Sequence, residues 1–410
     1  MIFYPLYIDP GTGSALFSII IGIAATVYFL ARGLFLKLGV VLFRKKQNAD
    51  SQYKYVIYAE DKRYFPFFES ILDEFEERKI ELHYLTTSDD DPIFSSKYNF
   101  IKGKFIGKGN KAYAFLNFLS AEFVLSTTPH LDVFQWKRSK NVKHYCHMIH
   151  AAGGAALYHL FSLDYFDSVL VSSELEISEI RTFEQIRKTS EKQLIVAGNT
   201  FFDRCAEKIK QIPKEENHVF TVLVSPSWGK SALLSVFGEK LLDPLSITGW
   251  RIIVRPHPQS LIVEKQMISA LTEKYKENAN IEWDYNHENI YSLSKSDVMI
   301  SDFSGIIYDY VFLFNKPVIA NIQDLDFKRL DAQDLPQEPY FIQCIKKISL
   351  QIDSGALDNL KEIISSLTCD AKIQYIREEI KNSMWKYQGE SSRRISDFMI
   401  QTVEKEDASN

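Results

Sequence analysis

Hydrophobic and polar positions follow two different periods that alternate along the chain. Short apolar runs at 55–58 and 80–85 are separated by a stretch of helical period at 65–78, and a second such stretch lies near 111–120. Buried parallel strands are typically short apolar runs, whereas amphipathic helices repeat every 3.6 residues. The order therefore predicts βαβ units and a parallel sheet. Further strands of this first series are expected at 123–126, 142–149, 168–171 and 194–196.

A polar stretch at 211–218 separates this series from a second one of the same kind. The second series has apolar runs at 219–224, 250–255, 280–283, 298–301 and 317–320. We therefore expect an α/β fold with two Rossmann-like domains in tandem. Their expected bounds are 52–210 and 218–385, and a helical tail follows at 386–410, with a frayed end from residue 404 onward.

The N-terminal segment 15–31 carries no charge and is long enough, at about 1.5 Å per residue, to span a hydrocarbon core. Basic residues follow it at Arg32, Lys37 and 44–46. The positive-inside rule then predicts a single-pass anchor, residues 1–46, in the inner (cytoplasmic) membrane, with the remaining domains in the cytoplasm. Two alternatives remain open, a cleaved signal peptide and a buried core helix.

Composition excludes some classes of function. The chain has 410 residues, of which 46% are apolar, enough for about two hydrophobic cores. Its formal net charge of −5 and the lack of a basic patch argue against a nucleic-acid partner. The four cysteines are far apart in sequence and have no metal-ligand spacing, so we expect free thiols, no metal site and no cofactor.

In an open parallel sheet, ligands bind beyond the carboxyl ends of the strands, so the loops there are the candidate sites. The loop Ser301–Gly305 follows an apolar strand and precedes a helical pattern. Ser304 is placed as a helix N-cap, and Gly305 has no side chain to keep a phosphate away. This loop is a candidate phosphate site, although an ordinary strand–loop–helix junction would have the same sequence.

Two carboxylates accompany this loop. Asp302 would repel a phosphate, so we expect it to order the loop or to bind a sugar hydroxyl. Asp309 lies further along the expected helix. It is a candidate contact for a sugar or an acceptor, or else a surface carboxylate.

Two further loops lie on the same expected sheet edge. In Arg255-Pro256-His257-Pro258, Arg255 provides a planar fork of donors and His257 a titratable ring, and the prolines restrict the backbone. The second loop, 225–230, adds Ser225, Ser227 and Lys230 as candidate phosphate contacts. The alternative for His257 is a structural role.

His150 ends an expected strand of the first domain and is followed by small residues. A histidine at this point has a suitable unperturbed pKa to accept a proton from an acceptor hydroxyl. His144, His147 and His150 follow one another at intervals of three residues, a spacing that does not bring successive side chains to one face of a strand. We therefore expect no metal, and His144 and His147 are either packed or exposed.

Taken together, these motifs resemble the CDP-glycerol glycerophosphotransferase family, which has the GT-B fold and includes teichoic-acid and capsule polymer enzymes. The similar segments are 198–204, 225–228, 255–258, 301–309 and 315–319. Family members often follow their N-domain histidine with Gly, Pro and Lys, whereas this chain has Ala151-Ala152-Gly153-Gly154.

The resemblance implies that His257 and the loop Ser301–Gly305 hold the pyrophosphate of CDP-glycerol or of a related CDP-alditol. It further implies that His150 is the base for a hydroxyl of a lipid-linked or polymeric acceptor, with release of CMP. Two alternatives stay open: a GT-B glycosyltransferase that uses a nucleoside diphosphate sugar, and a non-catalytic anchored scaffold.

Overall fold

The computed structural model describes residues 21–28, 30, 52–150, 153–213, 218–286, 288–322, 325–367 and 371–409. Within these ranges, no helix is long and apolar enough to cross a membrane. Residues 15–20, 29 and 31 of the expected anchor lie outside them, whereas residues 21–28 form a helix whose side chains are exposed. The basic flank that would orient the anchor also lies outside the described residues, so the anchor stays a prediction.

The helices and strands form two successive series, in which η marks a 3-10 helix. The first comprises β1 (Tyr53–Ala59), η1 (Lys62–Tyr64), α2 (Phe65–Glu77), β2 (Leu82–Thr86), η2 (Pro92–Ser95), β3 (Ile101–Phe105), α3 (Asn110–Leu116), β4 (Ala121–Ser126), β5 (Val142–Met148), β6 (Ser168–Val171), α4 (Glu174–Arg187), β7 (Gln193–Val196) and α5 (Thr200–Ile209). The second comprises β8 (Thr221–Val224), α6 (Leu233–Val236), α7 (Glu239–Ser246), β9 (Arg251–Val254), α8 (Ser260–Val263), α9 (Lys265–Tyr275), β10 (Ile281–Trp283), α10 (Ile290–Lys295), β11 (Val298–Ser301), α11 (Ile306–Phe314), β12 (Val318–Ala320), η3 (Asp331–Asp334), α12 (Tyr340–Ile348), β13 (Leu350–Gln351), η4 (Ser354–Asn359), α13 (Leu360–Leu367) and α14 (Ala371–Met384), and the chain closes with α15 (Ser391–Ser409).

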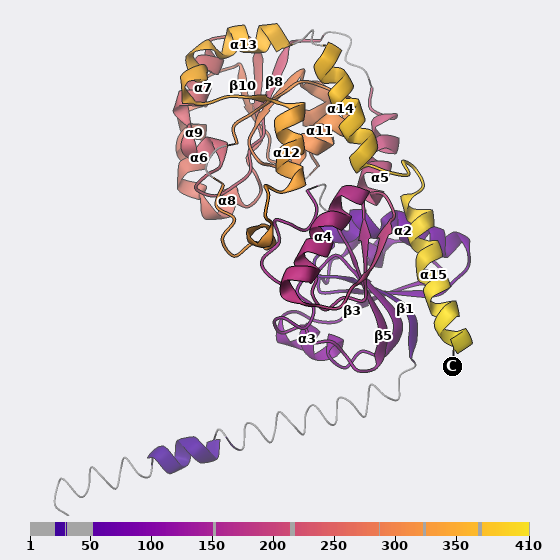
Figure 1. Cartoon of the computed structure of the whole chain (residues 1–410). Coiled ribbons are helices and arrows are strands. Elements are labelled where there is room, and N and C mark those ends of the chain that lie inside the picture. Colours follow the sequence, from indigo (N-terminus) through magenta and orange to yellow (C-terminus); the bar gives the residue numbers. More distant parts are fainter. Residues whose placement is uncertain are drawn as a thin grey trace, which may run out of the picture.

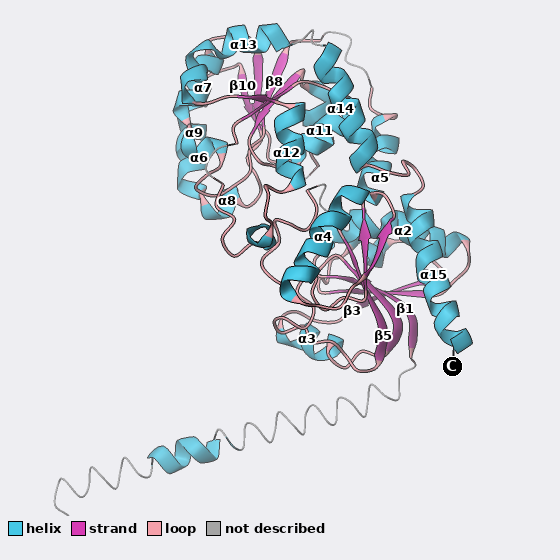
Figure 2. Ribbon diagram, viewed as in Figure 1, coloured by secondary structure: helices cyan, strands magenta, loops and turns pink. Residues whose placement is uncertain are grey.

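Each series builds one parallel sheet (Figure 2). The strand order is β3-β2-β1-β4-β5-β6-β7 in the first sheet and β10-β9-β8-β11-β12-β13 in the second. The order reverses between β1 and β4 in one sheet and between β8 and β11 in the other, and ligands of open α/β sheets bind at such switch points. The prediction of two Rossmann-like domains is confirmed.

Local sequence explains most of these elements. Helix α2 has a proline in its first turn, and its apolar residues recur three or four positions apart. They are buried against the first sheet: Phe65, Phe68, Ile71, Leu72 and Phe75. Strand β3 was not expected, because it is an edge strand that carries two lysines and buries only Ile101. The two-residue β13 was also missed.

The end of the chain returns to the first domain. Figure 1 shows α15 beside α2, away from the second domain that α14 covers. Ile395, Met399 and Val403 recur at one helical turn and are buried in the core of the first domain. The expected tail is therefore a packed helix, and it continues through Ser409 rather than fraying from residue 404.

Asp203 on α5 fixes this crossing. Its carboxylate accepts hydrogen bonds from Trp385 Nε1 at 2.8 Å, from the Gly389 amide at 2.8 Å and from the Ser391 amide at 3.1 Å. One carboxylate thus accepts hydrogen bonds from both sides of the turn between α14 and α15. These bonds hold the turn against α5.

A buried ion-pair network also joins the domains. Arg187, at the end of α4, contacts Asp164 at 2.8 Å in its own domain, and Asp331 at 2.6 Å and Asp334 at 2.8 Å in η3 of the other. The side chain of Arg187 is only 6% exposed.

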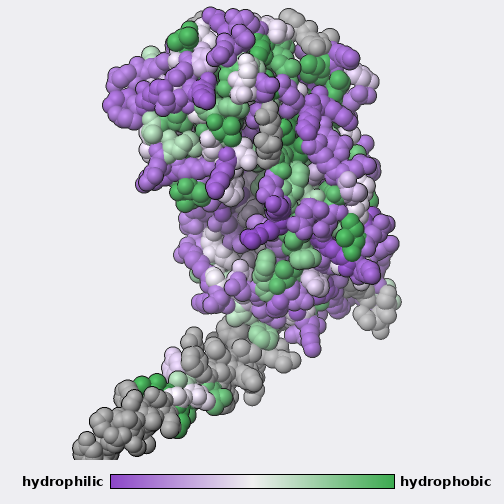
Figure 3. All heavy atoms as spheres, turned by 60° about the vertical axis from the view of Figure 1, so that its left-hand side comes forward, coloured by the Kyte–Doolittle hydropathy of each residue, from purple (hydrophilic) through white to green (hydrophobic). Residues whose placement is uncertain are grey.

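The face of the molecule seen in Figure 3 is largely hydrophilic over both domains, with hydrophobic side chains scattered among the polar ones.

Two buried carboxyl groups on α4 lie at the same interface. Glu179 accepts a hydrogen bond from the Tyr340 amide of the second domain at 2.7 Å, and Glu176 accepts one from the Ser172 amide at 3.1 Å. Burial raises the pKa of Glu176 to about 8 and that of Glu179 to about 7. At neutral pH, Glu176 is therefore mostly protonated and Glu179 is partly protonated.

Candidate functional site

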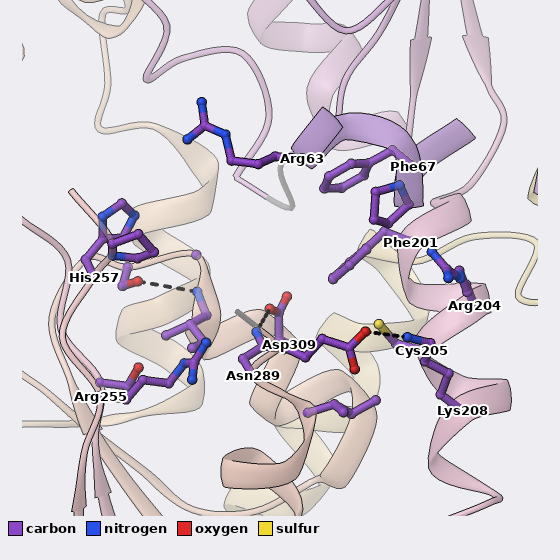
Figure 4. A pocket seen from close by; sticks show the side chains of 18 of the residues that line it. Arg63, Phe67, Phe201, Arg204, Cys205, Lys208, Arg255, His257, Asn289 and Asp309 are labelled. Carbon is purple, nitrogen blue, oxygen red and sulfur yellow. Dashed lines mark hydrogen bonds and ion pairs between the residues drawn. The ribbon is translucent and has the colours of Figure 1, made fainter. Parts of the chain in front are cut away.

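A cavity of about 460 Å³ lies between the two domains, at the switch point of the second sheet. Helix α5 and the start of α2 line one side, and loops that follow strands of the second sheet line the other (Figure 4). The lining residues are Arg63, Pro66, Phe67, Phe201, Arg204, Cys205, Lys208, Ser225, Pro226, Arg255, Pro256, His257, Pro258, Glu288, Asn289, Ile290, Ser304, Gly305, Ile306 and Asp309.

The start of α11 forms part of the cavity wall. Ser304, Gly305 and Ile306 line the cavity, and a β-carbon added at Gly305 would meet nothing within 4 Å. The helix cap is Gly305 rather than the expected Ser304, whose hydroxyl lies 3.5 Å from the Ile306 amide. A helix N-terminus carries about half a positive charge, so the wall suits a phosphate.

Asp302 does not line the cavity, because its carboxylate is fully buried beneath the loops. It accepts hydrogen bonds from the amides of Ser227 at 2.9 Å, Leu233 at 2.9 Å and Ser304 at 3.1 Å. Burial raises its pKa to about 6, although the three amides oppose the shift. Of the two roles expected for Asp302, the geometry fits the one that orders the loops.

Three other candidates from the sequence also lie outside the cavity lining. Ser301 is buried and donates its hydroxyl proton to the Ser225 carbonyl at 2.6 Å. Ser227 contributes its amide to the bond with Asp302, and Lys230 is exposed. Ser225 does line the cavity, so this loop presents one of its three candidate side chains there.

Arg255 lines the cavity, but its guanidinium is already occupied. It forms an ion pair with Asp284, in which the two side chains are 9% and 4% exposed, and Nη2 donates to the Asn286 carbonyl at 2.7 Å. Asp284 also accepts a hydrogen bond from the Ser292 hydroxyl. Arg255 therefore holds the loop between β10 and α10 in place. A direct phosphate contact by Arg255 stays a prediction.

His257 has one ring nitrogen directed by the backbone. Its Nδ1 accepts a hydrogen bond from the Gln259 amide at 3.1 Å, which places the proton of the neutral ring on Nε2. Burial lowers the pKa of His257, although Glu264 opposes the shift. The ring is therefore neutral at neutral pH, and its Nε2–H group is available to donate a hydrogen bond to a phosphate oxygen.

Asp309 on α11 also lines this cavity. Asn289 donates to its carboxylate at 3.0 Å, and burial raises its pKa to about 7. At neutral pH this carboxyl group is partly protonated, so it repels a nearby phosphate less and is able to donate a hydrogen bond to a hydroxyl. The expected contact with a sugar or an acceptor is geometrically open to it.

The wall contributed by α2 and α5 was not expected. Phe201, Arg204, Cys205 and Lys208 recur three or four positions apart on α5 and face the cavity (Figure 4). Arg63 joins them from η1. The helical spacing of aromatic and basic residues within 201–208 was the available signal, but it indicates only a shared helix face and not what that face meets.

His150 lies near the cavity but not on its lining. The rings of Tyr64 and Phe67 each meet its imidazole at 5.2 Å between centroids, and Phe67 itself lines the cavity. Its Nδ1 is 3.4 Å from the Tyr158 hydroxyl. Burial lowers its pKa to about 4, so the ring is neutral at pH 7 and is able to accept a proton.

The neighbouring histidines have packing roles. His144 stacks on Phe123 at 4.9 Å, and its Nε2 lies 2.8 Å from the Ser168 hydroxyl. His147 is fully buried, and burial lowers its pKa to about 3. Among the residues that the structure describes, no three His, Cys, Asp or Glu side chains gather in a way that suits a metal ion.

Comparison with known proteins now identifies the family. Residues 43–400 match the family described as CDP-Glycerol:Poly(glycerophosphate) glycerophosphotransferase. The chain belongs to this family. Membership in this glycerophosphotransferase family supports a transferase of cell-surface polymers as the broad function. No match to a curated protein was found.

Solved structures of several bacterial and archaeal proteins share the fold. The UDP-GlcNAc 2-epimerase of Methanocaldococcus jannaschii, in complex with UDP-GlcNAc and UDP, is 15% identical, with a TM-score of 0.56 over 85% of this chain and 99% of that one. MnaA of S. aureus with UDP is 13% identical, with a TM-score of 0.55 over 86% and 97%. A glycosyltransferase of Rickettsia africae is 11% identical, with a TM-score of 0.52 over 86% and 99%. At these identities the likeness shows the fold alone, and it supports the expected GT-B arrangement.

Proposed function

We propose that this glycerophosphotransferase-family protein transfers glycerol phosphate, or another alditol phosphate, from its CDP derivative to a hydroxyl of a lipid-linked or polymeric acceptor. CMP is the second product, and the biological setting is the assembly of a teichoic-acid-like or capsule polymer. Family membership supports the reaction class. The observation that carries the proposal is the cavity, in which the start of α11 and the Nε2 donor of His257 face basic side chains of α5.

The bonds in this reaction balance without an oxidant or reductant. The acceptor oxygen attacks the β-phosphorus of the donor, a new phosphodiester bond forms, and the pyrophosphate P–O bond breaks. CMP leaves with that electron pair, and the acceptor proton passes to a base. Negative charge that accumulates on the leaving phosphate is stabilised by the start of α11 and by His257.

His150 is the proposed base. Burial lowers its pKa to about 4, which keeps the imidazole unprotonated throughout the physiological range but makes it a weaker base than the unperturbed histidine expected from the sequence. It adjoins Phe67, which lines the donor cavity, and Tyr64, which leads away from it. His150 thus lies close to the cavity without lining it, which supports its assignment as the base.

A second candidate function is glycosyl transfer from a nucleoside diphosphate sugar. The same helix N-terminus would bind that diphosphate, and the M. jannaschii and S. aureus proteins with this fold are known with UDP bound. The products separate the two functions, because glycosyl transfer releases a nucleoside diphosphate and forms a glycoside. A non-catalytic scaffold would release neither.

Membrane anchoring at the cytoplasmic face is part of the proposal, supported by the uncharged segment 15–31 and the basic residues after it. A lipid-linked acceptor fits such an anchor. Fractionation of cells that express the full chain, with and without residues 1–46, tests this. Equal recovery of both forms in the soluble fraction would contradict the anchor.

The activity test uses the detergent-solubilised full chain, radiolabelled CDP-glycerol and a pool of lipid-linked saccharides. We expect CMP release together with label in the lipid phase, and a loss of about 100-fold or more in His150→Ala. His218→Ala is the matched control, because His218 is exposed, pairs with Asp297 at 2.7 Å and does not line the cavity.

The other outcomes point to different functions. Turnover of a nucleotide sugar without turnover of CDP-glycerol would indicate the glycosyltransferase. If neither donor is consumed by a folded protein, and His150→Ala and His257→Ala change nothing measurable, the scaffold alternative stands and the proposed reaction is wrong.

A further inference from the structure

A second cavity, of about 260 Å³, opens in the first domain at the carboxyl ends of β1 and β2. It lies beside the switch point between β1 and β4, the position at which an open α/β sheet binds its ligand. The lining residues are Tyr58, Glu60, Asp61, Arg63, Tyr64, Thr87, Gly109, Ala112 and Tyr113. The donor site described above uses only one of them, Arg63.

The short helix η1 separates the two cavities. Arg63 lines both of them, and Tyr64 lines the second cavity while its ring lies 5.2 Å from that of His150. The helix is fixed at its start, where the Asp61 carboxylate accepts hydrogen bonds from the Arg63 amide at 2.9 Å and from Arg63 Nε at 2.8 Å. A ligand in the second cavity would therefore lie next to the proposed base, across η1 from the nucleotide.

The charges of the second cavity differ from those of the first. Two carboxylates and one guanidinium line the second cavity, whereas four cationic side chains, two carboxyl groups and the start of α11 line the donor cavity: Arg63, Arg204, Lys208, Arg255, Glu288 and Asp309. Excess negative charge disfavours a phosphate group. The second cavity is thus electrostatically unsuited to the nucleotide or to any other anionic group.

The remaining lining groups suit hydroxyls. Each sugar or polyol hydroxyl both donates and accepts a hydrogen bond, so it pairs with carboxylates, with a guanidinium and with the hydroxyls of Thr87 and Tyr113. Aromatic rings such as Tyr64 and Tyr113 provide flat apolar surfaces beside a polar tip. Glu60 is exposed at the cavity, where it is accessible to a ligand.

We propose that this second cavity binds the hydroxyl-bearing end of the acceptor, an uncharged sugar or polyol unit. The identification of the ligand as the acceptor rests on the proposed function. The binding of an uncharged polyhydroxyl compound in this cavity does not depend on that function. Arg63 lines both cavities, so the reacting hydroxyl of a unit bound here extends past Arg63 to the donor and His150, and phosphate groups of the acceptor lie outside the cavity.

The test combines direct binding with kinetics. Saturation-transfer NMR on the full chain uses methyl glucoside and sorbitol as uncharged probes and glycerol 3-phosphate as an anionic probe. Glu60→Gln removes one charge at nearly constant shape, and Tyr113→Phe removes one hydroxyl. Asp89→Asn is the matched control, because Asp89 is exposed, pairs with Lys108 and does not line the cavity.

We expect an uncharged probe to bind the wild-type protein and Asp89→Asn, and to bind Glu60→Gln and Tyr113→Phe at least about 10-fold more weakly. In the transferase assay, the same two variants raise the KM for the acceptor by a similar factor, while the KM for CDP-glycerol stays within about twofold. Unchanged melting temperatures of the variants establish that they fold.

The proposal fails if the variants bind the probes as the wild-type protein does, or if glycerol 3-phosphate competes for the same site. If both variants transfer normally from CDP-glycerol and their KM for the acceptor is unchanged, the cavity is not the acceptor site, and the proposed function is unaffected. Probe binding that depends on Glu60, in a protein that does not use CDP-glycerol, would keep the site and refute the function.

Discussion

Asp302 gives the sharpest test of how the donor cavity is built. Its two carboxylate oxygens accept hydrogen bonds from three backbone amides, those of Ser227 and Ser304 on two loops and that of Leu233 at the start of α6. Asp302→Ala leaves all three amides without this acceptor in a fully buried place. At about 1–3 kcal/mol for each unsatisfied amide, the cost is about 3–9 kcal/mol.

Asp302→Asn separates the roles of the two oxygens. With its amide oxygen in the place of Oδ1, asparagine still accepts from Ser227 at 2.9 Å and Ser304 at 3.1 Å. Its NH₂ group then replaces Oδ2 and faces the Leu233 amide, so two donors meet across about the same distance. One lost bond and the loss of charge predict a destabilisation of about 2–4 kcal/mol.

Chemical denaturation at pH 8, where the Asp302 carboxyl with its pKa of about 6 is ionised, measures these costs. We also expect the KM for CDP-glycerol to rise about 10-fold in Asp302→Asn, because the loop that bears Ser225 and Pro226 loses one attachment. Asp353→Asn is the control, since the exposed Asp353 accepts a single amide bond, from Gly355 at 2.9 Å, and should lose less than about 0.5 kcal/mol.

Two results would refute this reasoning. If Asp302→Asn unfolds at the denaturant concentration of the wild-type protein and its donor KM is unchanged, the three amide bonds do not hold the loops. If Asp302→Asn and Asp302→Ala are equally destabilised, the count of acceptors is not what determines the cost.

Three further predictions concern buried charges. The imidazole of His150, with its pKa lowered to about 4 by burial, should not titrate between pH 5.5 and 8 in NMR of histidine-labelled protein, and a midpoint near 6.5 for the resonance absent from His150→Ala would contradict this. Burial raises the pKa of Glu176 to about 8, so its stabilising contribution is complete below the unfolded-state pKa near 4.5 and is lost as the pH rises through 8. The stability of Glu176→Gln relative to the wild-type protein should therefore increase between pH 5 and 9, by no more than about 5 kcal/mol. A difference in melting temperature that stays constant over this pH range would contradict the prediction. Arg187→Met leaves buried carboxylates unpaired and should cost about 3–5 kcal/mol in chemical denaturation, part of which Asp331→Asn should restore in the double variant; a cost below about 1 kcal/mol would show that the network is dispensable.

The two sheets were predictable because buried parallel strands appear in the sequence as continuous apolar runs. The central strands β8, β9 and β11 are continuous apolar runs with nearly every residue buried, and their loops were located correctly. Edge strands leave a weaker record. One face of β3 is exposed and carries lysines, so its run of apolar residues is broken and its pairing with β2 decides its structure.

The site was predictable only in part, because side-chain partners come from distant segments. The structure brings Ser225, His257, Ser304, Gly305 and Asp309 to one cavity, as the sheet topology implies. The partner that occupies the Arg255 guanidinium is 29 positions away. Two of the three amides that hold Asp302, those of Ser227 and Leu233, lie 75 and 69 positions before it. The spacing of residues within a short motif does not show which distant residues pair with them.

The basic wall of the donor cavity depends on a still less local feature, the placement of one domain against the other. Two cations of this wall form ion pairs in the structure, Arg204 with Glu69 at 2.5 Å and Lys208 with Glu288 at 2.8 Å. The Lys208 pair has side chains 38% and 54% exposed, and such a pair contributes only about 0–1 kcal/mol. A hydrogen bond to a charged phosphate contributes about 1.5–3 kcal/mol, so a diphosphate is able to displace the carboxylate at a net gain. These ion pairs therefore hold the cations in position without preventing donor binding.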